Sequence, residues 1–295
     1  MKYLLHSVSY AGLWGQASLG VDDFVRKAAG LGYDGVMLMA KRPHVSVLDY
    51  GAAERAALRR LLEECGLKHV CLAGYNNLTA DMEHGEVPMR EINVSYLMEL
   101  AGLAQDIGAQ TVRIFTGYEN PAADYSRQWR LIVDTLREAG DRCAGYGVVL
   151  GVQNHHDVGV GYESMADLLR TVDRENVKAM FDAWAPGLQG DDLEKAAGLM
   201  APWTVHTTVA DYQLRPRWKY RPDLVNYEKQ TPFVQAVPMG SGFLNYAGFF
   251  RSLKEEGFDG TVAYEMCSPI ADGGSMESLD RYAARFLEWV GRYVE

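Results

Sequence analysis

Short apolar runs alternate with longer segments of helical periodicity along almost the whole chain. Most of the runs are rich in β-branched residues, as strands buried on both faces of a parallel sheet are. The eight runs cover residues 3–9, 35–40, 69–74, 111–116, 148–154, 177–182, 204–210 and 261–267. The pattern therefore predicts eight parallel strands.

A segment with apolar residues at helical spacing follows each run. In residues 22–31 the apolar positions include Phe24, Val25 and Ala28, and Asp22 or Asp23 can cap the start. The other predicted helices are residues 52–65, 96–107, 129–146, 165–172, 193–200, 246–255 and 279–290. Eight strand–helix units predict an α/β fold, a single (β/α)8 TIM barrel over residues 1–295. A doubly wound open sheet is the alternative, although no G-x-G-x-x-G follows the first strand.

One long segment after the seventh predicted strand interrupts the alternation of strands and helices. Residues 211–245 combine prolines and aromatic residues with the basic side chains Arg215, Arg217, Lys219 and Arg221. In a barrel this segment follows the carboxyl end of a strand, which is the face where active sites are built. We therefore expect a long loop that covers the substrate, with Arg215, Arg217 and Lys219 as binding residues. A surface excursion or an oligomer contact is the alternative.

Charge and cysteine content narrow the class of partner. The formal net charge of -10 over 295 residues disfavours nucleic acid and anionic membrane surfaces as partners. No apolar stretch approaches the length of a membrane span. The four cysteines show no C-x-x-C spacing, so no structural zinc site is expected. The first residues are too polar after a short apolar part for a signal peptide, so we expect no signal peptide there and a cytoplasmic protein.

Polar residues stand at the carboxyl ends of the last four predicted strands. Strand alternation lets Gln153, His155, Asp182, His206 and Glu265 converge at the mouth of the barrel. Carboxylates, imidazoles and an amide oxygen in one pocket suit Mn²⁺, Mg²⁺ or Zn²⁺. The predicted metal ligands are Asp182, Glu265, His206 and Gln153, and the predicted proton-transfer residues are Glu265 and His155. A core hydrogen bond for His206, and salt bridges from the two carboxylates to Arg113 or Lys178, are the alternatives.

Residues near other strand ends are candidate substrate contacts. His6 lies in the first apolar run and could bind a substrate hydroxyl, although a histidine there is also a common core residue. Tyr10, Trp14 and Trp184 could form apolar walls against a sugar ring, or simply pack. His155 and His156 are consecutive, so alternation predicts that at most one of them faces the site.

Several of these segments carry a family resemblance. They read PMGSGFLNYAGFFRSLKEEGFDGTVAYE, LGYDGVML, GVVLGVQNHHD, VKAMFDAW and TVHTTVADY. With them the chain resembles, over nearly its whole length, the xylose-isomerase-like TIM-barrel superfamily of sugar isomerases and epimerases. The resemblance implies a divalent metal ion and a small carbohydrate substrate, and it makes a homo-oligomer an open possibility.

The chain departs from the pattern that the resemblance implies at two ligand positions. That family usually holds its ion with Glu, Asp, His and Glu from strands five to eight. Asp182 and Glu265 match, but Gln153 replaces the first glutamate and Thr208 stands at the histidine position, while His206 matches a different, upstream histidine. A glutamine side chain cannot take up a proton at neutral pH. Either His155 supplies a second base, or one base suffices, or the chemistry has been lost.

Three functions follow from this reading. The first is a divalent-metal-dependent isomerase or epimerase of a sugar, keto-sugar or cyclitol, working through an enediolate. The second is a lyase or dehydratase that eliminates a substituent from a 3-keto-sugar, keto-glycoside or keto-inositol. The third is a metal-free sugar-binding protein or partner subunit.

Overall fold

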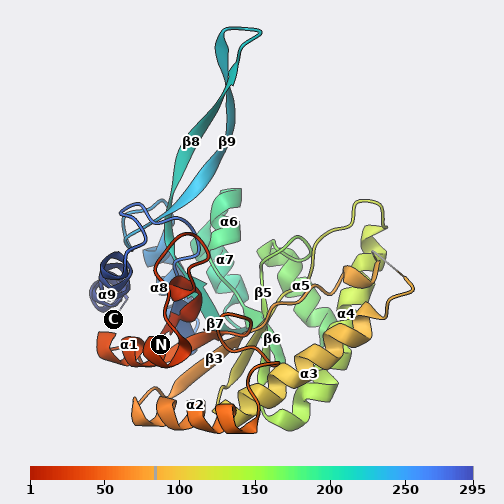
Figure 1. Cartoon of the computed structure of the whole chain (residues 1–295). Helices are drawn as coiled ribbons and strands as arrows, with labels where there is room; N and C mark the ends of the chain where they lie inside the picture. The colour runs from red at the N-terminus through yellow and green to blue at the C-terminus, as the bar shows by residue number, and fades with distance from the viewer. Residues whose placement is uncertain (83–84, 295) are drawn as a thin grey trace.

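Eight parallel strands close into a barrel in the computed structural model, which describes residues 1–82 and 85–294 (Figure 1). Around the barrel the strands follow the order β1–β10–β7–β6–β5–β4–β3–β2. The predicted TIM barrel is confirmed, and all eight predicted strands are present. They are β1 (Lys2–His6), β2 (Gly35–Met39), β3 (His69–Ala73), β4 (Thr111–Ile114), β5 (Val149–Gln153), β6 (Val177–Met180), β7 (Thr204–Val209) and β10 (Thr261–Tyr264).

The predicted helices surround the barrel. They are α1 (Val21–Leu31), α2 (Ala52–Glu64), α3 (Met89–Ile107), α4 (Tyr125–Cys143), α5 (Tyr162–Val172), α7 (Leu193–Met200), α8 (Tyr246–Glu255) and α9 (Met276–Tyr293). Short 3-10 helices are η1 (Ser7–Tyr10), η2 (Ala80–Met82) and η3 (Ala144–Tyr146). The short helix α6 (Trp184–Gln189) was not predicted, because its sequence WAPGLQ contains a proline and a glycine. Proline is tolerated there because it lies in the first turn. Within the described residues, no helix is long and apolar enough to cross a membrane.

The prediction of a long loop after the seventh strand is wrong. That segment forms an antiparallel hairpin of β8 (Asp211–Arg221) and β9 (Asn226–Val237), which projects away from the barrel (Figure 1). The prolines of this segment disfavoured a strand prediction, because proline lacks the backbone N–H that a sheet requires. A two-stranded ribbon tolerates them, and the register shifts between Arg215 and Arg217, where Pro216 lies.

The base of the hairpin is fixed by the carboxylate of Asp211. Its Oδ2 accepts hydrogen bonds from the backbone N–H groups of Gly240 at 2.9 Å and Gly242 at 2.8 Å. A Cβ atom at Gly242 would lie 1.9 Å from Asp211 Oδ1, so only glycine fits at this position. The glycines of the PMGSGF segment therefore serve to join the hairpin to α8.

We expect the barrel to fold without the projecting part of the hairpin. Leu214 and Val234 are cross-strand neighbours, so an Asn-Gly turn can replace residues 215–233 and leave Val234 packed on the core. Residues 214–220 and 222–229 are exposed, and the free energy of unfolding should therefore change by less than about 1 kcal/mol. Urea denaturation followed by far-ultraviolet circular dichroism measures this. Loss of a cooperative transition would show that the hairpin supports the barrel.

Strand alternation divides the core into two parts. Inside the barrel lies a small cluster of apolar side chains, formed by Leu4, Met37, Cys71, Ala73, Met180 and Ala263. A much larger cluster fills the space between the strands and the helices. Every second side chain of a strand points into the barrel, and each inward side chain lies nearer the carboxyl end of the strand than the one before it. The residues two positions after Leu4, Met180 and Ala263 are His6, Asp182 and Glu265, and this layer carries the candidate site.

Candidate active site

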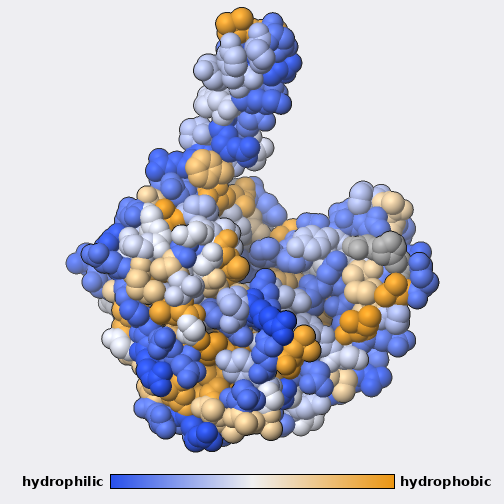
Figure 2. All heavy atoms as spheres, viewed as in Figure 1, coloured by the Kyte–Doolittle hydropathy of each residue, from blue (hydrophilic) through white to orange (hydrophobic). Residues whose placement is uncertain are grey.

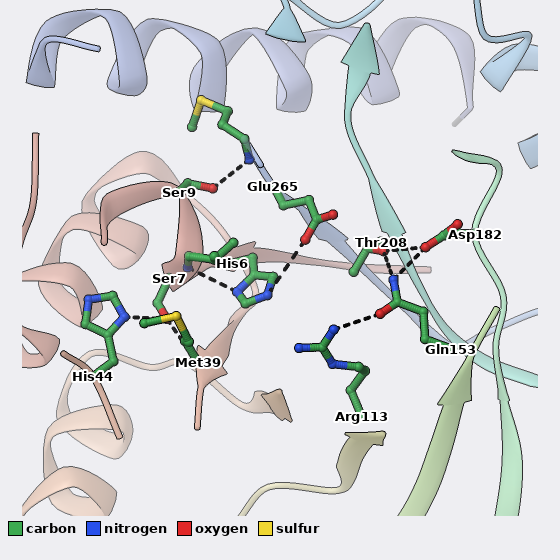
Figure 3. A network of polar contacts seen from close by, with 12 residues as sticks. His6, Ser7, Ser9, Met39, His44, Arg113, Gln153, Asp182, Thr208 and Glu265 are labelled. Carbon is green, nitrogen blue, oxygen red and sulfur yellow. Dashed lines mark hydrogen bonds and ion pairs between the residues drawn. The ribbon is translucent and has the colours of Figure 1, made fainter. Parts of the chain in front are cut away.

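A network of polar side chains lies at the carboxyl ends of the strands (Figure 3), one layer above the apolar interior cluster. His6 comes from β1 and Arg113 from β4, while Gln153 ends β5 and Thr208 lies in β7. Asp182 and Glu265 follow the last residues of β6 and β10. The structure thus brings together three of the predicted ligands, Gln153, Asp182 and Glu265.

Gln153 is the centre of a hydrogen-bonded network. Its Oε1 accepts a hydrogen bond from Arg113 at 2.8 Å, and its Nε2 donates to Asp182 Oδ2 at 2.6 Å and to Thr208 Oγ1 at 3.0 Å. The Thr208 hydroxyl donates to the same Asp182 oxygen at 3.1 Å. Burial raises the pKa of Asp182 to about 6, and the hydrogen bonds from Gln153 and Thr208 oppose this rise.

Glu265 faces the imidazole of His6 across 3.7 Å, measured from Oε2 to Nε2 (Figure 3). The Glu265 side chain is 18% exposed. Burial raises its pKa to about 7, although a hydrogen bond with the Cys267 thiol opposes the rise. The carboxylate can therefore both take up and release a proton near neutral pH. Ser9 Oγ accepts a hydrogen bond from the backbone N–H of Met266 at 2.8 Å, which holds the chain just after Glu265 in place.

His6 is held as a neutral ring with one defined tautomer. The backbone N–H of Val8 donates to His6 Nδ1 at 3.2 Å, so the ring proton lies on Nε2, the atom that faces Glu265. Burial, together with the positive charge of Arg113, holds the pKa of His6 well below its usual value. His6 is therefore a neutral hydrogen-bond donor toward the cavity at pH 7.

Arg113 is the residue that the sequence analysis missed. It is 6% exposed, and its guanidinium lies over the rings of Phe115 at 3.9 Å and Tyr75 at 4.7 Å. It forms no ion pair with a carboxylate in the part of the chain that the structure describes. The signal in the sequence is an arginine in phase with Thr111 inside an apolar predicted strand, where its charge needs a partner.

A cavity of about 720 Å³ opens over this layer, and Figure 2 shows the surface hollowed beside the base of the hairpin. Its lining includes the polar side chains His6, Arg113, Gln153 and Glu265 and the aromatic side chains Trp14, Tyr75, Phe115 and Tyr118. A smaller cavity of about 160 Å³ contains Asp182 and Thr208 and shares Gln153, His155, Glu265 and Cys267 with the first. The volume of the larger cavity is in the range of sites that bind small organic ligands.

Three of the predicted site residues lie at these cavities, namely Trp14, Trp184 and His155. Trp14 lines the larger cavity, Trp184 the smaller one, and His155 both. The expectation that His155 and His156 point to opposite faces is wrong, because both line the larger cavity. His156 has a φ of 70°, so the chain has already left the extended conformation there and strand alternation no longer applies. Partial burial and the charge of Arg113 lower the pKa of His155 to about 4, which makes it a weak base.

His206 does not join the other predicted ligands. It pairs in register with Met180 and Thr261, one layer deeper in the barrel, and its Nδ1 lies 2.6 Å from Thr261 Oγ1. Its side chain is fully buried and lines neither cavity. Two residues further along β7, Thr208 takes the place in the upper layer. We therefore withdraw His206 as a ligand.

Four predicted substrate contacts also lie elsewhere. Arg215, Arg217 and Lys219 are exposed on the hairpin and line neither cavity, because the segment is a projecting ribbon rather than a covering loop. Tyr10 is fully buried in η1, where its hydroxyl donates to Asp280 Oδ1 at 3.0 Å. These residues are not substrate contacts in this structure.

Tyr10→Phe should affect stability and leave the site unchanged. Removal of the hydroxyl deletes one hydrogen bond to the Asp280 carboxylate, which costs about 1–2 kcal/mol of unfolding free energy. Chemical denaturation of the two proteins measures the difference, and sugar-induced thermal stabilisation reports on the site. A lost sugar response with unchanged stability would place Tyr10 in the site after all.

The donor set does not fit the divalent ion that the resemblance implies. Among the described residues, no group of three or more His, Cys, Asp or Glu side chains could hold a metal ion. At two of the four positions stand the uncharged side chains of Gln153 and Thr208, and Gln153 turns its N–H group, not its oxygen, toward Asp182. A divalent ion needs lone pairs at that place.

Comparisons with known proteins place the chain in a family. The sequence profile of the xylose isomerase-like TIM barrel family matches residues 25–288. The solved D-psicose 3-epimerase of Clostridium cellulolyticum H10, crystallised with D-tagatose, has a TM-score of 0.78 at 15% identity, with 100% of both chains covered. A probable 3-DHS dehydratase from Bacillus anthracis has a TM-score of 0.70 at 18% identity, covering 99% of this chain and 100% of that one.

A third solved structure, L-ribulose 3-epimerase, has a TM-score of 0.72 at 14% identity and covers 99% of this chain and 94% of its own. At such low identities these likenesses describe the fold alone. No curated protein matches the sequence of the chain. The family profile covers most of the chain and agrees with the closed eight-stranded barrel. The chain belongs to the xylose isomerase-like TIM barrel family.

Proposed function

We propose that the protein is an isomerase of a small carbohydrate, which it converts by proton transfer beside a carbonyl group. The observation that carries the proposal is the pairing of Glu265, a carboxylate that titrates near neutral pH, with the neutral Nε2–H of His6 at the floor of a large cavity. A general base works best when its pKa lies near the operating pH. The similar solved structures are named as sugar 3-epimerases and a probable dehydratase, which supports a polyhydroxylated substrate.

Aromatic side chains around the cavity suit the apolar faces of a sugar. Trp14, Tyr75 and Phe115 lie in its lining, where their rings can cover C–H groups of the substrate. The carbonyl end of the substrate would lie over His6 and Glu265, within reach of both side chains. This orientation leaves the remaining hydroxyl groups toward the open side of the cavity.

Glu265 performs the proton transfer in this proposal. Its carboxylate removes the proton from the carbon beside the carbonyl, and the electron pair of that C–H bond forms an enediolate. The Nε2–H of His6 donates a hydrogen bond to the carbonyl oxygen, where the negative charge develops. A neutral imidazole can polarise a carbonyl in this way, as it does in triosephosphate isomerase. The protonated Glu265 then returns the proton to the former carbonyl carbon, after a proton has moved between the two oxygens.

Among the described residues, Glu265 is the one carboxylate that lines the larger cavity, and this favours isomerisation over epimerisation. Epimerisation delivers a proton to the opposite face of the carbon, which calls for a second base, and Gln153 cannot take up a proton. Isomerisation between an aldose and a ketose needs only one group on one face. The same single base would also serve an elimination, in which the enediolate expels a neighbouring substituent, so a lyase is the second candidate.

A product assay separates these functions. We expect the protein to interconvert an aldose and its ketose when a panel of four- to six-carbon sugars is followed by nuclear magnetic resonance. An inverted stereocentre beside an unchanged carbonyl would indicate an epimerase, and a new double bond or a released substituent would indicate a lyase. Sugar binding without any product would leave a binding protein and would refute the proposal.

A further inference from the structure

We infer that this site works without a divalent ion, and that Arg113, held by Gln153, supplies the positive charge at the reacting oxygen. The inference rests on the proposed function for what that charge does. The absence of an ion-binding donor set, by contrast, can be tested without any reaction. The inference follows from three features of the site. These are the orientation of the Gln153 amide, the residue types at the ligand positions and the buried charge of Arg113.

The amide of Gln153 has one orientation that satisfies its neighbours. A guanidinium can only donate, so the atom 2.8 Å from Arg113 must be the amide oxygen. The Asp182 carboxylate accepts, so the atom 2.6 Å from it must be the amide nitrogen. A rotation of the amide by 180° would set donor against donor at Arg113 and acceptor against acceptor at Asp182. The hydrogen bond from Arg113 therefore keeps the N–H group of Gln153 turned toward Asp182, where an ion would need an oxygen.

Thr208 completes this network on the other side. Its hydroxyl accepts from Gln153 and donates to Asp182, so its one proton and one of its two lone pairs are in use (Figure 3). Asp182 Oδ2 thus receives two hydrogen bonds from neutral donors. These donors, together with the charge of Arg113, stabilise the buried carboxylate. An arriving ion would have to break all three bonds and leave Arg113 without its acceptor.

Arg113 is the cation that remains at the cavity. Its guanidinium is almost fully buried, lines the cavity and has no carboxylate partner within residues 1–82 and 85–294. Its Nε also lacks a hydrogen-bond partner there. A buried, unpaired charge is unfavourable, so a negatively charged oxygen in the cavity is favoured. The rings of Tyr75 and Phe115 and the amide of Gln153 fix the guanidinium in advance, which is what stabilisation of a developing oxyanion requires.

Metal content and Mn²⁺ titration test the first half of the inference. We expect purified protein to hold no stoichiometric divalent ion by elemental analysis and to show no saturable Mn²⁺ binding by calorimetry. The double variant Gln153→Glu/Thr208→His restores the two ligand types, and we expect it to bind one ion per chain. One ion per chain in the unsubstituted protein, lost in Asp182→Asn, would overturn the inference whatever the double variant does.

Binding of an aldonate tests the role of Arg113. Its carboxylate mimics the charge of an enediolate, and its hydroxyl groups mimic those of the sugar. We expect Arg113→Met to weaken aldonate binding about tenfold or more, and Arg113→Lys to weaken it less, because lysine keeps the charge. Equal affinity in Arg113→Met and the unsubstituted protein would overturn this assignment. Both readouts are independent of turnover. An inactive protein would therefore refute the proposed function, together with the role of Arg113 at a reacting oxygen, and would leave standing the absence of an ion site and the binding of an anionic oxygen by Arg113.

Discussion

Glu265→Gln should lower kcat by about 10²- to 10⁴-fold, the range that a general acid–base group contributes. Glutamine has nearly the same shape as glutamate and can still contact His6, but it cannot take up the substrate proton. Because burial raises the pKa of Glu265 to about 7, the charged form is poorly stabilised in the folded protein. We therefore expect the variant to unfold at the same temperature or a higher one. Steady-state kinetics and thermal denaturation measure the two effects.

Two further substitutions control for this result. Glu265→Asp keeps the carboxylate but withdraws it by one methylene, and misplacement by about 1 Å can cost about 10²-fold. Glu255→Gln makes the same chemical change at an exposed position of α8 and should leave kcat unchanged. Nearly full activity in Glu265→Gln would contradict the proposed mechanism.

Arg113→Met should lower kcat by about 10²- to 10³-fold, which is the usual effect of removing one donor that stabilises an oxyanion. Methionine fills a similar volume beside Tyr75 and Phe115 but carries no charge. The change in KM should be smaller than the change in kcat, since the negative charge develops only during the reaction. The measurement is a full set of steady-state constants for both proteins.

Arg113→Lys serves as the matched control for charge. It should keep more activity than Arg113→Met, but less than the natural residue, because an ammonium on a flexible stem is less fixed than a guanidinium stacked on rings. If both variants turn over at the natural rate, Arg113 is a structural residue and the electrostatic account is wrong. Far-ultraviolet circular dichroism confirms that each variant is folded.

Local patterns along the chain predicted the barrel. The βα alternation sets both the strands and their number, and a glycine in the left-handed conformation ends helices such as α1 at Gly32 and α3 at Gly108. Alternation within strands also predicted the inward phase of Gln153, Asp182 and Glu265. These features depend on neighbours in the sequence, and this is why the sequence shows them.

The features that the sequence did not predict depend on contacts between distant segments. His206 and Thr208 share one face of β7, and only the register against β10 and β6 shows which of them reaches the upper layer. Arg113 can be assigned to the site only from the tertiary structure, which gives it no carboxylate partner among the described residues. The hairpin after β7 was not predicted because its sequence contains prolines, which disfavour strands in general but are tolerated in a two-stranded ribbon.

Exchange of a substrate proton with solvent tests the central claim most directly. The sugar that stabilises the protein most against heat would be incubated with it in D2O and recovered for mass spectrometry. The account predicts one deuterium at the carbon beside the carbonyl, and no incorporation with Glu265→Gln. No deuterium in any bound sugar, or incorporation at an equal rate in the variant, would contradict proton transfer by Glu265.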